Sequence, residues 1–430
     1  MAREMKDSGI EWVGRIPSTW DSMRLKYAAS YNDETLDENT AEDYEFDYID
    51  IGSVEYGKGI TQYQHMRFQE APSRARRIVK NNDVILSTVR TYLKAVASIE
   101  ERSDPQIVST GFVVLRARIG KITPLFLKYA VLSNAFISLV EAKSTGISYP
   151  AINSTDVMNI AIPLPELSEQ QKITDYLDIE CARIDAVMEQ TRASIEEYKK
   201  LKQAVITQAV TKGIRSNRPM KDSRIDWLGK VPVDWNVYRI ANLYDERNES
   251  GEDSLPILSV SINTGISDHE VADEEQARVF VRSEDKSKYK RVYPGDLAYN
   301  MMRAWQGAFG AVRVDGMVSP AYVVAKPKHN INLDSRYMEA LLRTPSAIEE
   351  MHRYSHGITD FRLRLYWPEF KNIRVCIPSI DEQKEISDYI DKIASDVDTM
   401  ISRKEQLLTE MESYKKSLIF EYITGKREIK

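Results

Sequence analysis

The sequence has few cysteines and no long hydrophobic run, and each absence excludes a class of protein. Its two cysteines, Cys181 and Cys376, lie far apart and outside any cluster with metal-ligand spacing, so neither a disulfide framework nor a zinc site is predicted. No apolar stretch approaches the length that spans a bilayer, and the N-terminal MAREMKDSG lacks the apolar core of a signal peptide. These absences predict a cytoplasmic protein.

Motifs for catalysis are also missing. The sequence contains no G-x-x-x-x-G-K-[ST] loop, no adenine-methyltransferase tetrapeptide and no Cys/His nucleophile signature, which argues against a stand-alone enzyme. His352 and His356 are four residues apart and could face a metal together, but no third ligand is evident. We therefore interpret the chain as a binding protein without an active site.

The charge is segregated along the chain. The net charge is −6, yet residues 28–55 contain no Lys or Arg, whereas residues 66–94 contain seven basic residues and two acidic ones. The second half repeats an acidic stretch followed by a basic one. A basic face can bind phosphates even when the whole chain is acidic, although solvated charged faces are the simpler alternative.

Several short sequence motifs occur twice in the same order. GIEWVGRIPSTW (9–20) returns as RIDWLGKVPVDW (224–235), NNDVILSTVR (81–90) corresponds to YPGDLAYNMMR (293–303), and LSEQQKITDYLD (167–178) corresponds to IDEQKEISDYID (380–391). An ordered set of repeated landmarks indicates a tandem duplication.

The sequence pattern of each copy predicts a globular α+β domain followed by a long helix. Short β-branched and aromatic runs such as FDYIDIGSV and DVILSTV are typical of strands. After Pro165 and Pro378, a 3-4 apolar spacing continues without Gly or Pro to Gly213 and Gly425, as in a coiled coil. Lys202 and Lys415 interrupt this seam at matching positions. We expect two α/β domains separated by an antiparallel two-helix coiled coil with pseudo-twofold symmetry. The predicted segments are 1–164 (first domain), 165–213 (central helix), 214–377 (linker and second domain) and 378–430 (C-terminal helix).

These motifs resemble the DNA-specificity subunits of type I restriction–modification systems. The carriers are the W-x-G-x-x-P-x-x-W phrases, the two helix openings, the Gly295-Asp296 strand motif and the helix exits AVTKG and YITGK. The resemblance implies two target-recognition domains, each reading half of a bipartite double-stranded DNA sequence, with the helices fixing the spacer. It also implies two methyltransferase subunits that bind S-adenosylmethionine and methylate adenine. Restriction translocase–nuclease subunits that use ATP and Mg²⁺ would join them in a bacterial or archaeal cytoplasm. This chain would hold no cofactor.

Candidate DNA-binding residues lie in polar or basic loops at equivalent places of the two copies. Arg and Lys can bind guanine O6 and N7, and Asn and Gln can bind adenine N6 and N7. Arg90 and Arg303 could instead form ion pairs inside the fold. In the first copy the candidates are Arg74, Arg76, Arg77, Thr88, Arg90, Lys94, Ser144, Thr145, Ser148 and Tyr149. In the second they are Arg291, Asn300, Arg303, Trp305, Gln306, His356, Thr359, Asp360, Arg362 and Arg364.

The repeated tryptophans have two interpretations. They could pack each lead-in against a helix base, or contribute to the surface that binds methyltransferase subunits, or do both. The candidate subunit-interface residues are Trp12, Trp20, Trp227, Trp235, Tyr176 and Tyr389. A coiled-coil scaffold that binds only proteins, without DNA specificity, is the alternative function.

Overall fold

The computed structural model divides the chain into two compact units that do not follow chain order. It describes residues 3–252, 254–262, 264–269, 288–357 and 363–429. One unit joins Met1–Thr191 to Glu405–Lys430, and the other is Arg192–Lys404. Part of the second basic stretch and the candidates Thr359, Asp360 and Arg362 lie outside the described residues.

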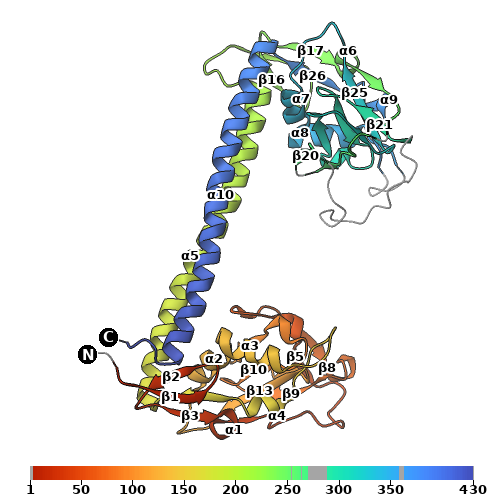
Figure 1. Cartoon of the computed structure of the whole chain (residues 1–430). Coiled ribbons are helices and arrows are strands. Elements are labelled where there is room, and N and C mark those ends of the chain that lie inside the picture. The colour runs from red at the N-terminus through yellow and green to blue at the C-terminus, as the bar shows by residue number, and fades with distance from the viewer. Residues whose placement is uncertain (1–2, 253, 263, 270–287, 358–362, 430) are drawn as a thin grey trace. The chain divides into compact units, whose positions relative to one another are not determined.

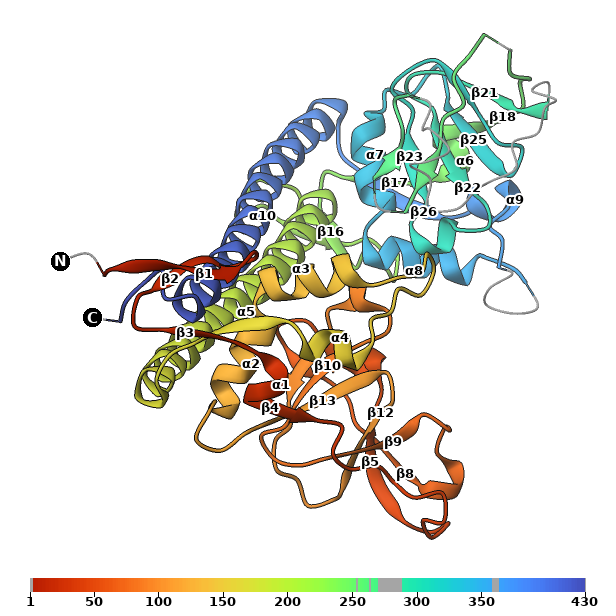
Figure 2. The same ribbon diagram turned by 60° about the horizontal axis from the view of Figure 1, so that its bottom comes forward.

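The first unit contains two four-stranded sheets, and short helices lie against one of them, the sheet that includes β10, β11 and β13 (Figures 1 and 2). Their strand orders are β11-β10-β13-β4 and β8-β5-β12-β9, and among these pairs β12–β5 is parallel. Helices α2 (Pro124–Leu132) and α3 (Asn134–Lys143) bury Phe126, Leu127 and Phe136 in the main core. The sheet strands are β4 (Ala29–Tyr31), β5 (Glu45–Ile49), β8 (Gln64–Arg67), β9 (Ala75–Val79), β10 (Val84–Ser87), β11 (Val96–Ser98), β12 (Gln106–Ser109) and β13 (Phe112–Ala117). Smaller elements are β1 (Met5–Ile10), β2 (Gly14–Pro17), β3 (Asp21–Arg24), α1 (Leu25–Ala28), β6 (Val54–Glu55), β7 (Gly59–Ile60), α4 (Ser154–Met158) and β14 (Ala161–Leu164).

The second unit repeats the central pairings of the first. Strand β22 pairs with β23 and β25 as β10 pairs with β11 and β13, and β17–β26 corresponds to β3–β14. Its elements include β15 (Met220–Asp222), β16 (Lys230–Pro232), β17 (Asn236–Arg239), α6 (Ile240–Leu243), β18 (Tyr244–Arg247), β19 (Val260–Ser261), β20 (Gly265–Ile266) and β21 (Lys290–Val292). They continue with β22 (Leu297–Asn300), β23 (Phe309–Ala311), β24 (Gly316–Val318), β25 (Tyr322–Pro327), α7 (Ser335–Leu342), α8 (Pro345–Arg353), α9 (Trp367–Phe370) and β26 (Arg374–Ile377). The predicted α+β composition is confirmed.

The two long helices, α5 (Leu167–Lys212) and α10 (Ile380–Ile423), contact each other within each unit. In the first unit Lys415 Nζ lies 2.6 Å from Asp185 Oδ1, and the rings of Tyr176 and Tyr422 are 4.6 Å apart. In the second unit Lys202 Nζ lies 2.7 Å from Asp398 Oδ2. Within each unit the start of one helix therefore lies beside the end of the other.

The lysines predicted in the helical seam each meet an aspartate of the opposite helix. Asp185 and Lys202 on α5 correspond to Asp398 and Lys415 on α10, so the same pair forms once in each unit. Such solvated pairs contribute at most about 1 kcal/mol each. Their matched positions favour one alignment of the helices over shifted ones.

The aspartate of the repeated strand motif is a buried ion-pair partner in both units. Asp83 accepts two hydrogen bonds from Arg116 of β13, at 2.8 and 2.7 Å, and Asp296 accepts two from Arg247 of β18, at 2.9 and 3.2 Å. The arginine comes from a different strand in each unit, while both aspartates also accept a bond from the backbone N–H three residues earlier. The motif thus serves the fold.

No single helix among the described residues is long and apolar enough to cross a membrane. One bent pair, α2 with α3, passes by combined length and composition, with 62° between the helices. Most of the apolar side chains of this pair are buried in the main core of the first unit.

Replacing Arg116 with alanine should destabilise the first unit strongly. The change would leave the Asp83 carboxylate, only 2 % exposed, without its charge partner, which typically costs about 3–5 kcal/mol. Thermal unfolding followed by circular dichroism measures this, with exposed Arg118→Ala as the control. Equal melting temperatures for the two variants would contradict the assignment.

Both cysteines should be unreactive in the folded protein. Burial raises the pKa of Cys181 and raises that of Cys376 to about 11, so both thiols stay protonated at pH 8, and the thiolate is the reactive form. A chromogenic thiol reagent should titrate neither cysteine in the native protein and both in denaturant. Rapid labelling of the native protein would show that these helix and strand positions open.

Candidate nucleic-acid interface

In the first unit, three segments meet beyond the end of β10. Thr88 N donates to Gly111 O at 2.7 Å, Ile152 N donates to Thr88 O at 2.9 Å, and Thr91 N donates to Pro150 O at 3.4 Å. The turn after β12, the segment that follows β10 and the loop after α3 are therefore joined by their backbones. This end of the unit contains most of the first-copy candidates.

The loop after α3 is closed at its neck. Thr145 and Ala151 exchange two backbone hydrogen bonds of 2.9 Å each, and Thr91 Oγ1 donates to Ser144 Oγ at 2.9 Å. Between these anchors Thr145, Ser148 and Tyr149 are exposed, as is Ile147. These hydrogen bonds hold the two ends of the loop together, so the residues between them are presented from a fixed position.

The segment after β10 has an unusual backbone. Arg90 and Lys94 have φ values of 51° and 53°, in the left-handed region, on either side of the short helix η3 (Thr91–Leu93). Such conformations cost about 1 kcal/mol or more in a residue other than glycine, and they cluster at functional sites. Tyr92 and Leu93, between them, are exposed.

The basic candidates of the first unit differ in how they are paired. Arg74 donates to Asp50 Oδ2 at 2.8 Å and to the Tyr48 hydroxyl at 3.2 Å, and Lys94 Nζ lies 3.3 Å from Glu141. Arg76 covers the ring of Phe68 at 4.9 Å, and Arg77 is half-buried, which lowers its pKa. Arg90 makes no ion pair with any described residue; its guanidinium lies 5.1 Å from the centroid of the Tyr149 ring. Among the described residues, Arg90 therefore has no part in an ion pair inside the fold.

The second unit has equivalent backbone hydrogen bonds but presents different side chains. Leu365 N donates to Met301 O at 2.9 Å, which corresponds to Ile152 and Thr88, and His356 and Arg364 exchange two bonds of 3.0 Å. This loop is two residues longer than the one between Thr145 and Ala151. The Trp305 ring lies 5.7 Å from His352, and Gln306 is exposed. The backbone frame is thus shared, and the presented side chains differ.

Two second-unit candidates are occupied inside the fold. Asn300 is 9 % exposed and its Oδ1 accepts from Met302 N at 2.9 Å. Arg291 pairs with Glu252 at 2.6 Å and with Asp315 at 3.5 Å. Arg303, half-buried at the start of the turn, makes no ion pair with any described residue.

Trp20 and Trp235 are buried at the joint between each domain and the helices. The Nε1 of Trp20 donates to Glu169 Oε2 at 2.9 Å, and the guanidinium of Arg3 lies 5.4 Å from its ring and pairs with the same glutamate at 2.6 Å. Arg218, Trp235 and Glu382 form the matching group, although Trp235 Nε1 has no hydrogen-bond partner among the described residues. At 1 % exposure, these two rings serve packing.

The other proposed interface residues keep some surface. Trp12 Nε1 donates to Ala161 O at 3.1 Å and Trp227 Nε1 to Arg374 O at 3.2 Å, each on the last strand of its domain. Trp12, Trp227 and Tyr176 are half-buried, and Tyr389 is exposed. Their role in binding another subunit stays a prediction.

Comparison with known proteins matches this architecture to one family. A model of the type I restriction modification DNA specificity domain matches residues 17–197, from the first tryptophan phrase into α5. The type I restriction enzyme MjaVIII specificity subunit of Methanocaldococcus jannaschii is 24 % identical over 97 % of this chain and 95 % of its own. The EcoBI specificity subunit of Escherichia coli is 22 % identical over 75 % of this chain and 70 % of its own.

Solved structures share the fold. A chain from a structural study of complex assembly and conformational transition of the type I R-M system aligns with a TM-score of 0.73 at 22 % identity, covering 96 % of this chain and 99 % of that one. The HsdS subunit from Thermoanaerobacter tengcongensis aligns with a TM-score of 0.56 at 23 % identity, covering 96 % and 98 %. Over nearly its whole length the chain is similar to a type I restriction enzyme specificity subunit, and residues 17–197 match the model of the type I DNA specificity domain.

Some exposed or paired residues are not predicted from the sequence. Ile147, Tyr92 and Leu93 are exposed on the two segments that the Thr91–Pro150 hydrogen bond joins, but a largely apolar side chain has no sequence feature that distinguishes an exposed position from a buried one. Arg3 and Arg218 were also missed, although both stand 17 residues before the second tryptophan of the phrase. That repeated spacing was the available signal.

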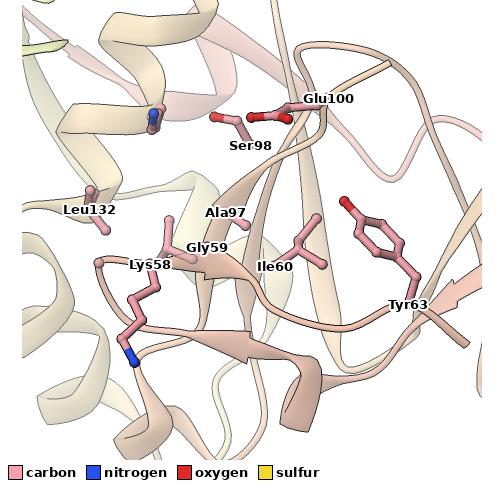
Figure 3. Close-up of a pocket in the computed structure, with 11 residues that line it drawn as sticks. Lys58, Gly59, Ile60, Tyr63, Ala97, Ser98, Glu100 and Leu132 are labelled. Carbon is pink, nitrogen blue, oxygen red and sulfur yellow. The ribbon is translucent and has the colours of Figure 1, made fainter. Parts of the chain in front are cut away.

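A pocket in the first unit lies away from this interface. It has a volume of about 180 Å³ and is lined by the β6–β7 hairpin, β11 and α2. Figure 3 shows Ser98 and Glu100 on one side and Lys58 on the other. Ser98 pairs with Val84 at the start of β10, whereas the candidate interface follows the end of that strand. The pocket is therefore no part of the interface.

Among the described residues, Asp47, His65 and Asp104 are the group able to hold a metal. Asp47 Oδ2 accepts from Arg102 at 2.9 Å, and Oδ1 lies 3.2 Å from His65 Nδ1. The arginine already neutralises the buried carboxylate, which disfavours a second cation at that carboxylate. His352 and His356, the pair considered from the sequence, lie at the end of α8 and at the loop neck.

Proposed function

We propose that this chain is the sequence-specific DNA-recognition subunit of a type I restriction–modification complex and has no active site of its own. Each domain reads one half of a bipartite target in double-stranded DNA. The observation that carries this proposal is the pair of loop-and-turn ends, which share backbone anchors and differ in the side chains that they present. Direct readout of different bases uses different side-chain contacts to base edges, whereas the contacts that position the protein can stay the same.

The long helices support the bipartite arrangement. We propose that α5 and α10 pair along their whole length as an antiparallel coiled coil between two copies of one duplicated cassette, with pseudo-twofold symmetry. The reciprocal Lys202–Asp398 and Lys415–Asp185 pairs support one fixed alignment. In that arrangement helix length sets the number of base pairs between the half-sites.

The partners in this proposal are two adenine-methyltransferase subunits and the restriction translocase–nuclease subunits. S-adenosylmethionine belongs to the former, and ATP and Mg²⁺ belong to the latter. The exposed edges of Trp12, Trp227 and Tyr389 and the neighbouring helix surface are candidates for the methyltransferase contacts. The complex works in the cytoplasm of a bacterium or an archaeon.

Methylation mapping of the native genome tests the function. The proposal predicts N6-methyladenine at a split motif that disappears when this gene is deleted and returns when it is supplied on a plasmid. The loss follows because the methyltransferase subunits would have no other source of sequence selection.

The control is the same deletion complemented by a chain truncated before α10. That truncation should not restore methylation, because the first domain loses the core residues that α10 supplies. An unchanged methylation pattern in the deletion strain would contradict the proposal and favour a protein-only scaffold.

A further inference from the structure

The first domain presents a group of exposed side chains on two neighbouring segments, which we call the tip: Arg90, Tyr92, Leu93, Ile147 and Tyr149. Tyr149 is 66 % and Tyr92 51 % exposed, and Ile147 is fully exposed. The group comes from two segments joined by the Thr91–Pro150 and Thr91–Ser144 hydrogen bonds. It is therefore one surface.

The tip has the properties of a contact surface. Ile147 gains no burial within the first unit, and clustered apolar groups exposed to water usually mark a binding site. The left-handed conformations of Arg90 and Lys94 place Tyr92 and Leu93 outward at a cost in backbone energy. No acidic residue belongs to the tip, so the surface suits a polyanion with apolar features.

The Arg90 guanidinium is arranged to use its edge. Its Cζ lies over the Tyr149 ring, 5.1 Å from the ring centroid, and no described carboxylate pairs with it. A guanidinium held beside an aromatic ring by a cation–π contact keeps its N–H groups free for bidentate binding. In the DNA major groove, the matching acceptors are O6 and N7 of guanine.

We infer that Arg90, positioned by Tyr149, reads a guanine in the half-site of the first domain, and that Ile147 contacts a thymine methyl group beside it. This inference rests on the proposed function and adds the base and the residues that read it. Arg74 is paired with Asp50, and Lys94 is paired with Glu141. Because these two neighbouring cations are occupied by carboxylates, Arg90 is the better placed of the three to bind a base.

The second domain provides the internal comparison. Arg303 occupies the same place after β22, but there the turn presents Met302, Trp305 and Gln306, and the loop is two residues longer. The residues around the shared arginine therefore differ where the two half-sites are expected to differ. A change at Arg90 should alter one half-site and a change at Arg303 the other.

The test uses the full chain co-expressed with the methyltransferase subunits of its own system in a host without N6-methyladenine. Wild type, Arg90→Ala, Arg90→Lys, Tyr149→Ala, Tyr149→Phe and Ile147→Ser are compared by genome-wide methylation mapping. Arg118→Ala is the matched control, because Arg118 is exposed at the opposite end of the sheet. Thermal melts establish that each variant folds.

Arg90→Ala and Arg90→Lys should both accept other bases at one G·C position of one half-site, with a loss of discrimination of about tenfold or more. Tyr149→Ala should relax the same position, whereas Tyr149→Phe, which keeps the ring, should not. Ile147→Ser should relax an adjacent A·T position. The other half-site and Arg118→Ala should be unchanged.

Two results would overturn the inference while leaving the proposed function intact. One is an unchanged motif in Arg90→Ala. The other is uniformly weaker methylation of all sites with a smaller salt dependence of DNA binding, the behaviour of a phosphate contact. Absence of any split motif with the wild-type chain would instead overturn the proposed function itself.

Discussion

The pairing of α5 with α10 is the contact on which both units depend. The core of the first unit contains Leu418, Ile419, Tyr422 and Ile423 from the end of α10 together with Trp20 from the start of the chain. The core of the second contains Ala209 and Val210 from the end of α5 together with Trp235. The end of α10, from the second copy, therefore completes the core of the first domain, and the end of α5, from the first copy, completes the core of the second. Neither copy alone contains a full core.

The joint between domain and helices explains why the two tryptophan phrases are so alike. Gly425 and Gly213 end the helices with positive φ, and a Cβ at either glycine would press on the joint: on Pro17 in the first unit, and on Arg218 and Glu382 in the second. The Glu and the Gln at the start of each long helix make equivalent contacts in the two units. Glu169 and Glu382 bind the arginines, and Gln170 and Gln383 bind backbone groups of the preceding segments. A joint with this many matched contacts restricts substitution.

The loop ends are free of that restriction. The bonds between Ile152 and Thr88, and between Leu365 and Met301, fix only backbone atoms. Side chains on the loops can therefore change, and a loop can gain two residues, without disturbing the strands beneath. In the proposed function, this separation of a fixed joint from variable loop ends would let one scaffold read two different half-sites.

Local patterns predicted the long helices well. Their apolar spacing and the flanking Pro and Gly predict the central helix within 165–213, and the structure has it at Leu167–Lys212. The agreement is close because helix ends depend on neighbouring residues. The domain surfaces were harder to predict, because pairing depends on residues distant in sequence. Arg74 has the sequence context of a free cation but pairs with Asp50, and Asn300 has that of a base reader but accepts a hydrogen bond within its own turn. Ile147 has no polar signature and becomes conspicuous only when its exposure is known.

Exchange of a domain tests most directly the central claim that each domain reads its own half-site from a fixed joint. Residues 21–160 would be replaced by the corresponding segment of a family member with a known target, keeping the tryptophan phrase and both helices. The methylated motif should then change in one half only, with the other half and the spacer retained. A change in both halves, or in the spacer alone, would contradict the account.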